Sequence, residues 1–248
     1  YFLDINTSYL IILFISGLGG DHRTWSKVIN HLENPYNIVT FDNRDACMSE
    51  RSSQPYTIKD MADDVAGLLS SMDINKTHIV GYSMGGAIAQ EVAISYPDLV
   101  DKLILLSTYT SGDPRGDVIF ESLASVRGKV SADEFLRLSL PWSFSVDEFQ
   151  VPGFIETLIK DRAADEYRQE YSAYERQMRA TIAFESSGRL GNISAQTLMI
   201  FGDADILTPM RFALELVEGI RSSNLIILEN SGHGIVITRA KDIAHEID

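Results

Sequence analysis

The chain is poor in two kinds of residue that would have indicated particular scaffolds or partners. It contains a single cysteine, Cys47, among 248 residues, which excludes an internal disulfide and a cysteine-based metal cluster. Basic residues are outnumbered, because 21 lysines and arginines face 35 aspartates and glutamates, a formal net charge of −14. Nucleic acid and anionic membranes carry charge of the same sign, so neither is expected as a partner.

Long apolar runs are also absent. The longest, residues 9–15, is too short to cross a bilayer. No signal peptide is recognisable, so we expect a cytoplasmic location. The chain opens on Tyr1 rather than Met, already in a strand-like segment, and we expect further residues upstream. With 45% apolar residues, the chain can form one large α/β domain or a core with an inserted subdomain.

What the sequence does contain is an alternation of strand-like and helix-like segments. Short apolar runs are separated by segments with helical periodicity and by glycine, proline or polar residues. The expected strands are residues 9–15, 37–41, 77–80, 103–106, 197–201 and 225–228. This alternation predicts an α/β fold, with a mostly parallel sheet and helices on both of its faces.

The rhythm changes in the middle of the chain. Residues 109–189 contain no convincing strand but several helix-like segments. These segments are expected to break at Gly128, Pro141, Pro152 and Gly188. The sequence therefore predicts a helical cap, 109–189, inserted between two parts of an α/β-hydrolase-like core, 1–108 and 190–248.

The clearest functional signal is Ser83, in the stretch Gly81-Tyr82-Ser83-Met84-Gly85. A strand-like run precedes the serine and a helix-like run follows it, so its hydroxyl is expected on a sharp, exposed turn. The glycines remove side chains that would collide where strand and helix approach each other. Free amide groups at the start of the helix can stabilise negative charge on an attacked carbonyl. This pattern predicts a serine nucleophile.

A glycine-rich loop, Ser16-Gly17-Leu18-Gly19-Gly20, follows the first expected strand. Such loops can bind phosphate, but this spacing is neither Gly-x-Gly-x-x-Gly nor a Walker loop. Nucleotide binding is therefore not expected from it.

A serine hydroxyl is a weak nucleophile and needs a base, which in turn needs a group that orients it. Of five histidines, only His233 lies between glycines just past a strand, at the sheet edge where sites gather. The carboxylate is Asp203 or Asp205, since both follow the strand at 197–201. Position alone leaves that choice open. The order Ser, Asp, His is that of the α/β-hydrolase arrangement.

On these residues the chain resembles the α/β-hydrolase superfamily over nearly its whole length. The resemblance rests on the serine turn, on Gly202-x-x-Asp205-x-x-x-Pro209, and on Gly232-His233, with the glycine loop upstream. It implies a catalytic triad and an oxyanion hole made of two backbone amides, with no cofactor and no metal. The triad is Ser83, Asp205 and His233, and the amides are those of Leu18 and Met84.

Two loops depart from the pattern of the superfamily. The usual His-Gly opening of the oxyanion loop is Ser16-Gly17, which leaves the amide donors in place. The usual Asp-x-Arg-Gly-x-Gly-x-Ser loop reads DNRDACMS at residues 42–49 and has lost both glycines. Neither departure touches the triad.

Within the superfamily, a serine nucleophile argues against haloalkane dehalogenases and epoxide hydrolases, which place aspartate there. The chain looks most like small carboxylesterases, enol-lactonases and cofactor-free perhydrolases. We therefore expect hydrolysis of small, mostly apolar esters or lactones through an acyl-enzyme. A proline iminopeptidase-like aminopeptidase and a non-catalytic ligand receptor on a hydrolase fold are the alternatives. The natural substrate, the acyl chain length and the oligomeric state are not written in the sequence.

One helix face in the predicted cap carries aromatic residues. Tyr167, Tyr171, Tyr174 and Met178 follow one another at spacings of three or four residues. Such a face either packs on the core or lines a pocket above Ser83. In the second case the acyl group meets apolar surface and tyrosine hydroxyls, which favours neutral short or medium esters over aminoacyl substrates.

Overall fold

A computed structural model describes residues 8–248 of the chain. Within these residues a six-stranded sheet forms the centre, and all its neighbouring strands run parallel. The strands, in the order β2-β1-β3-β4-β5-β6, are β1 (Ile11–Ile15), β2 (Asn37–Thr40), β3 (Thr77–Tyr82), β4 (Val100–Leu106), β5 (Gln196–Gly202) and β6 (Ser223–Leu228). The predicted parallel α/β sheet is confirmed. The strand-like segment at Tyr1 lies outside the described residues.

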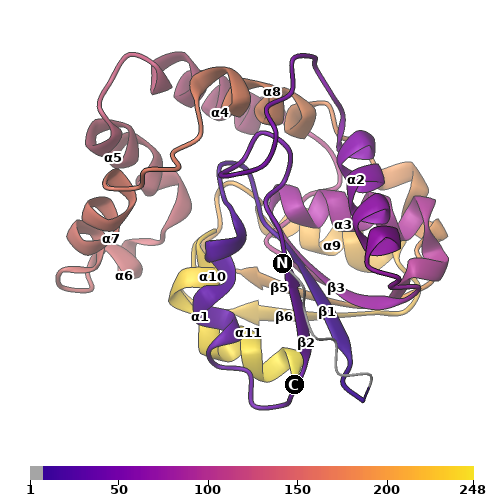
Figure 1. The fold of residues 1–248 in the computed structure, drawn as a ribbon. Helices are drawn as coiled ribbons and strands as arrows, with labels where there is room; N and C mark the ends of the chain where they lie inside the picture. Colours follow the sequence, from indigo (N-terminus) through magenta and orange to yellow (C-terminus); the bar gives the residue numbers. More distant parts are fainter. Residues whose placement is uncertain (1–7) are drawn as a thin grey trace.

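Helices cover both faces of the sheet (Figure 1). One face carries α1 (Ser26–Ile29), α10 (Ile235–Thr238) and α11 (Ala240–Ile247), and the other carries α2 (Ile58–Ser71), α3 (Met84–Ser95) and α9 (Met210–Gly219). Successive strand side chains point to opposite faces. Leu13 and Ile15 therefore share a core with α2 and α3, whereas Ile12 and Phe14 share one with α1 and α11. Burial on both faces explains the continuous apolar run of β1.

Five helices lie between β4 and β5 and gather at one end of the sheet (Figure 1). They are α4 (Pro114–Arg127), α5 (Ala132–Ser143), α6 (Val146–Phe149), α7 (Phe154–Ala163) and α8 (Tyr171–Ile182). We call them the helical insertion. They pack among themselves, α4 against α8 and α5 against α7. The limits 109–189 for a separate cap stay a prediction. In the part of the chain described, no helix is long and apolar enough to cross a membrane.

Two details predicted for the insertion are wrong. Pro141 does not end a helix, since α5 runs through it to Ser143. A proline in the last turn removes only one hydrogen bond from a helix that ends two residues later. Tyr167, predicted on one helix face with Tyr171, Tyr174 and Met178, precedes their helix, α8, which begins at Tyr171. The Asp165 carboxylate accepts a hydrogen bond from the Tyr167 N–H at 2.9 Å, a local turn that competes with the helix.

Candidate active site

Ser83 lies on the sharp turn between β3 and α3. Its φ and ψ angles are 55° and −121°, an unfavourable conformation for a residue with a side chain. Neighbouring groups hold it there, because the Ser83 N–H donates to the Leu106 carbonyl at 2.9 Å and Thr108 Oγ1 donates to the Ser83 carbonyl at 2.8 Å. The strand, turn and helix are therefore arranged as the sequence predicts.

The glycines beside Ser83 are required by lack of space. A Cβ on Gly81 would lie 2.4 Å from the carbonyl oxygen of Gly85, and a Cβ on Gly85 would lie 2.0 Å from that of Ile15. Both contacts are with backbone atoms, which cannot rotate away. Helix α3 can therefore begin directly against β1 and β3 only because these side chains are missing.

His233 and Asp205 continue a line of hydrogen bonds from Ser83. His233 Nε2 lies 2.9 Å from Ser83 Oγ, and His233 Nδ1 lies 2.8 Å from Asp205 Oδ2. The histidine is 6% exposed and the aspartate 4%. The three residues follow β3, β5 and β6, whose carboxyl ends share one edge of the parallel sheet. A serine, a base within reach and a carboxylate that orients the base are thus brought together.

The structure places the two candidate carboxylates in different surroundings. Asp203 is exposed, whereas Asp205 is buried and bonded to His233. Asp205 also accepts from the N–H groups of Leu207 and Thr208, at 2.9 and 2.8 Å, and from Thr208 Oγ1 at 2.6 Å. These charge-assisted bonds fix the carboxylate in its orientation. Sequence reasoning missed Thr208, although it stands three residues after Asp205.

Two backbone donors beside the serine are unused. In the part of the chain that the structure describes, the N–H groups of Leu18 and Met84 donate to no other group. The loop that holds Leu18 is braced through Ser16, whose Oγ donates to the Asp21 carbonyl at 2.8 Å and whose carbonyl accepts from Asn43 Nδ2 at 3.0 Å. Free N–H groups at this place are what an anionic oxygen on an attacked carbonyl needs.

A cavity of about 280 Å³ opens above Ser83 and His233, between the sheet edge and the helical insertion. The glycine loop forms part of its wall, and the insertion supplies most of its apolar lining. These apolar residues include Phe120, Leu123, Phe135, Leu136, Leu140 and Trp142. The cavity has the apolar wall and the convergent polar groups of a small-molecule site.

The predicted aromatic face only partly reaches this cavity. Tyr174 and Tyr167 line it, but Tyr171 and Met178 do not. Tyr171, in the first turn of α8, is 43% exposed. Met178 is buried in a small cluster with Tyr174 and Ala124, which fills the contact between α8 and α4. Some of these residues therefore line the cavity and others pack between helices. Their regular spacing in the sequence does not distinguish the two roles.

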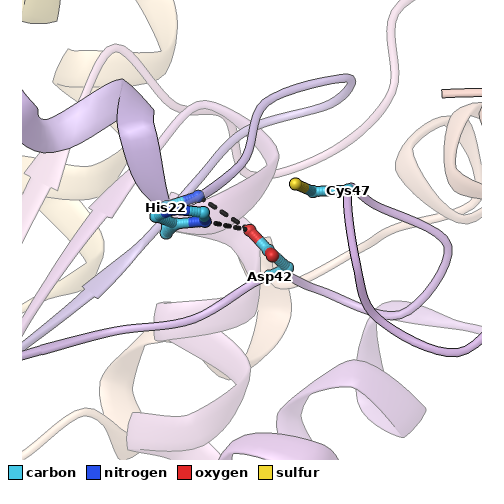
Figure 2. A group of neighbouring side chains, drawn as sticks. All are labelled: His22, Asp42 and Cys47. Carbon is cyan, nitrogen blue, oxygen red and sulfur yellow. Dashed lines mark hydrogen bonds and ion pairs between the residues drawn. The ribbon is translucent and has the colours of Figure 1, made fainter. Parts of the chain in front are cut away.

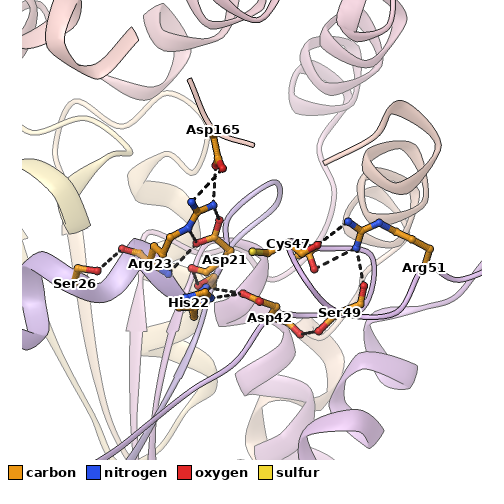
Figure 3. Close-up of polar contacts among 11 residues, drawn as sticks. Asp21, His22, Arg23, Ser26, Asp42, Cys47, Ser49, Arg51 and Asp165 are labelled. Atoms are coloured by element: carbon orange, nitrogen blue, oxygen red, sulfur yellow. Dashed lines mark hydrogen bonds and ion pairs between the residues drawn. The ribbon is translucent and has the colours of Figure 1, made fainter. Parts of the chain in front are cut away.

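The two carboxylates in the cavity lining, Asp21 and Asp165, are both paired with Arg23 (Figure 3). Arg23 Nη2 donates to Asp21 Oδ2 at 2.5 Å and to Asp165 Oδ2 at 2.7 Å. Burial acts to raise the pKa of Asp21, but the hydrogen bonds from Arg23 outweigh it and hold the pKa below its ordinary value. Both acids thus already have Arg23 as their partner.

A glutamate of the insertion holds the loop that carries His233. Glu148 of α6 is 8% exposed and accepts from the Gly232 N–H at 3.0 Å, from the Ser145 N–H at 2.6 Å and from Thr238 Oγ1 at 2.5 Å. The contact is close, because a Cβ on Gly232 would lie 2.7 Å from the Ser145 nitrogen. The position of His233 therefore depends on the insertion as well as on β6.

The loop of residues 42–49 borders the cavity at Cys47. Asp45 and Cys47 stand where the superfamily has glycines, and their φ angles are 70° and 41°. The left-handed conformation is unfavourable for both side chains. Asp45 is fully buried and accepts from Arg176 Nε and Nη2, at 2.8 and 2.7 Å, and from the Tyr56 hydroxyl at 2.8 Å. Burial acts to raise the pKa of Asp45, but these bonds hold it below its ordinary value.

His22, Asp42 and Cys47 form a group with atom types that bind metal ions (Figure 2). One such atom from each lies within 4.8 Å of the other two. The N–H and the Nδ1 atom of His22 both lie within 2.9 Å of Asp42 Oδ1. Burial, together with Asp42 and Asp21, raises the pKa of the Cys47 thiol. The two contacts with Asp42 join the segment of His22 to the loop of residues 42–49.

The family follows from comparison with known proteins. The chain matches the family model of the α/β hydrolase fold over residues 11–240. It belongs to the α/β-hydrolase family, and the resemblance stated from the sequence is confirmed. Two curated relatives are RutD proteins, named as carbamate hydrolases. The one from Agrobacterium fabrum is 31% identical over 234 residues, covering 92% of this chain and 87% of that protein. The one from Pseudomonas syringae is 25% identical over 229 residues, covering 92% and 88%.

Solved structures agree on the fold. An α/β hydrolase from a Medee basin deep-sea metagenome library has a TM-score of 0.89 at 20% identity, covering 100% of this chain and 90% of that chain. The enol-lactonase from Burkholderia xenovorans has a TM-score of 0.86 at 22% identity, covering 98% and 92%.

Proposed function

We propose that the chain is a serine hydrolase that cleaves carboxylic esters or lactones through an acyl-enzyme. The observation that carries this proposal is the line of hydrogen bonds from Ser83 Oγ through His233 to Asp205, at 2.9 and 2.8 Å. The line ends at a cavity, where a substrate carbonyl can approach the serine. Membership of a hydrolase family supports the same conclusion.

In the proposed reaction, His233 Nε2 takes the proton of Ser83 while Oγ attacks the carbonyl carbon. Asp205 stabilises the imidazolium that results, and the N–H groups of Leu18 and Met84 bind the oxyanion. When the tetrahedral intermediate collapses, the imidazolium returns its proton to the leaving alcohol, which in a lactone stays attached to the acyl chain. A water deprotonated by His233 then attacks the acyl-enzyme and releases the acid.

The helical insertion is proposed to act as a cap over this reaction. Its apolar side chains, with Tyr174 and Tyr167, would contact the acyl group and exclude water from it. A cavity of about 280 Å³ suits a small, mostly apolar acyl group.

Carbamate hydrolysis is a second candidate. The observation that favours it is the 31% identity to the RutD protein of Agrobacterium fabrum. The same attack on a carbamate carbonyl would release an amine or ammonia in place of an alcohol. Ammonia release from a carbamate, measured beside ester cleavage, distinguishes the two.

An aminopeptidase is less well supported. A free α-amine in the cavity would need a carboxylate partner. Both carboxylates in the lining, Asp21 and Asp165, are already bonded to Arg23. Proline p-nitroanilide should therefore be a poorer substrate than p-nitrophenyl butyrate.

The test is turnover of p-nitrophenyl butyrate by the wild type and by Ser83→Ala. We expect many turnovers in the wild type and a loss of several orders of magnitude in the variant, because triad members act as a unit. Ser125→Ala changes an exposed serine of α4 and serves as the control. Retention of more than about a tenth of the activity in Ser83→Ala would refute the nucleophile. A wild-type burst of about one ester per enzyme, without turnover, would favour the receptor alternative.

A further inference from the structure

Three arginines of the insertion line the cavity: Arg127 of α4, Arg162 of α7 and Arg168 of the segment between α7 and α8. Within residues 8–248 none of them forms a salt bridge. Other arginines pair with carboxylates, for example Arg176 with Asp45 and Arg189 with Glu91. In a chain with a net charge of −14, three arginines without a carboxylate partner thus line one cavity.

Arg127 is the most constrained of the three. Its Cζ atom lies 4.3 Å from the ring centroid of Tyr174 and 4.7 Å from that of Phe135, so the guanidinium is held between two rings. Nη2 donates to the Gln169 carbonyl at 3.1 Å, and Nε is buried without a partner. Burial lowers the pKa of Arg127 to about 10, which leaves it charged at neutral pH. A partly buried cation without a counter-charge is costly to the fold.

Among residues 8–248, no carboxylate forms a salt bridge with Arg127. The carboxylates in the cavity lining are Asp21 and Asp165, and both are bonded to Arg23 (Figure 3). Arg168, the charged group that acts on Arg127, is itself positive. A ligand in the cavity can therefore be the direct negative partner that Arg127 lacks.

Arg162 extends the positive charge toward the reacting groups. Burial acts to raise the pKa values of Asp21 and Tyr82, and the charge of Arg162 opposes it at both. The ring of Tyr82 lies 5.2 Å from that of His233. The cavity thus combines an apolar wall with positive charge on more than one side.

We propose that the natural substrate carries a carboxylate on its acyl part and that Arg127 binds this group while Ser83 attacks the ester or lactone carbonyl. Arg162 and Arg168 add favourable charge. The planar guanidinium can bind a carboxylate through its N–H groups, and its position between two rings fixes the plane in which they point. This inference rests on the proposed ester or lactone hydrolysis. It refines the prediction of mostly apolar substrates, which was drawn from an aromatic face that contains none of these arginines.

Two esters test the proposal: mono-p-nitrophenyl glutarate and p-nitrophenyl pentanoate. They share the leaving group and the acyl chain length, but the first ends in a carboxylate and the second in a methyl group. We expect the wild type to favour the glutarate ester by about 10- to 100-fold in kcat/KM, the value of a charge-assisted hydrogen bond. Arg127→Met keeps a long apolar side chain between the rings and should bring the ratio to about one.

Arg137→Met is the matched control, because Arg137 lies on α5, is exposed and pairs with Asp133 outside the cavity. It should leave the ratio unchanged. Arg127→Lys keeps the charge but loses the fork, and should fall between the wild type and Arg127→Met. A purely structural role for Arg127 would lower the rates on both esters together and leave their ratio as it was, which would overturn the proposal. A wild-type preference for pentanoate would do the same.

Binding provides a measurement that does not depend on turnover. In calorimetry, Ser83→Ala should bind glutarate more tightly than pentanoate, and adding Arg127→Lys should weaken glutarate binding by about tenfold. Equal binding of the two acids would refute the arginine site even if both esters are hydrolysed. If neither ester is turned over, the proposed hydrolysis fails, while glutarate binding still reports on Arg127 alone.

Discussion

Two segments at the cavity hold residues in left-handed backbone, the turn at Ser83 and the loop of residues 42–49. At the serine turn the neighbouring residues are glycines, and core backbone atoms fill the space that their side chains would need. In the loop, Asp45 and Cys47 adopt this conformation without being glycine, and bonds from Arg176 of α8 support it.

The serine turn and the loop of residues 42–49 are stabilised by different parts of the molecule. The serine turn is specified by β1, β3 and α3, which are all core elements. The loop depends on a buried ion pair with the helical insertion. We therefore expect substitutions among the core elements that position the triad to abolish activity or folding. Substitutions in the loop of residues 42–49 should weaken its contact with the insertion and leave the hydrogen bonds from Ser83 to His233 and Asp205 in place.

The largest effect is expected for Asp205→Asn, because the Asp205 carboxylate orients His233 through a hydrogen bond to Nδ1. An amide at this position can favour the wrong histidine tautomer, so kcat on p-nitrophenyl butyrate should fall by on the order of 10⁴-fold. Asp203→Asn changes an exposed carboxylate two residues away and should have a minor effect. The reverse order of the two variants would contradict the assignment.

Next comes Gly85→Ala, which adds a Cβ 2.0 Å from the Ile15 carbonyl oxygen. Helix α3 would have to move off the sheet, so we expect a loss of about 3 kcal/mol or more in the free energy of unfolding, measured by urea titration. Gly67→Ala is the control, because nothing lies within 4 Å of its added Cβ in α2. That variant should gain about 0.5–1 kcal/mol from helix propensity. Equal effects at both glycines would show that the close approach is not required.

Asp45→Asn tests the loop side by removing the charge that pairs with Arg176. Breaking a buried pair from one side costs about 3–5 kcal/mol, but the Arg176 side chain is 19% exposed and stays partly hydrated, so we expect about 1–3 kcal/mol. Activity per folded molecule should change far less than in Asp205→Asn. A loss of activity as large as that of Asp205→Asn would mean that the loop is part of the catalytic machinery.

The same pair sets a dependence of stability on pH. The folded pKa of Asp45 lies below its ordinary value, so the unfolded chain binds the proton first as pH falls. The stabilisation is complete above about pH 5 and disappears as pH falls through about 3.9 to the folded pKa. Urea titrations of the wild type and Asp45→Asn at neutral pH and near pH 3 should therefore show the gap between them shrinking in acid. A gap that widens would contradict the direction of the pKa shift.

The smallest effect is expected for Cys47→Gly, which relieves a φ angle of 41°. Relief of about 1–2 kcal/mol is opposed by about 0.5–1 kcal/mol of added freedom in the unfolded chain, so a net gain below about 1 kcal/mol is expected. Cys47→Ala keeps the Cβ and should show no gain. If alanine stabilises the protein as much as glycine, the backbone strain is not the cause.

The core was predictable because its signals are local. Apolar runs of strand length mark all six strands to within about three residues of the observed ends, and the largest difference is at the start of β4. Ser83 and His233 stand out because glycines surround them in the sequence. The choice of Asp205 over Asp203 already required the family pattern, since both follow the same strand, and the hydrogen bond to His233 agrees with it.

The rest of the cavity depends on contacts between segments far apart in the chain. Glu148 bonds to Gly232, 84 residues later, and Arg176 bonds to Asp45, 131 residues earlier. Nothing in the local sequence indicates either partner. Arg127 is missed for the same reason, because an arginine near the end of a helix is ordinary and only its burial between two rings singles it out.

The Glu148 contacts limit how this protein can be recombined with its relatives. A chimaera that exchanges the whole insertion would take away the carboxylate that the Gly232 N–H and Thr238 hydroxyl share. The histidine loop would then carry an unsatisfied buried donor next to His233. A chimaera that transfers α6 together with residues 229–238 avoids this loss. A graft of α4 and α5 alone leaves the hydrogen bonds of Glu148 in place and is the simpler route to a new acyl specificity.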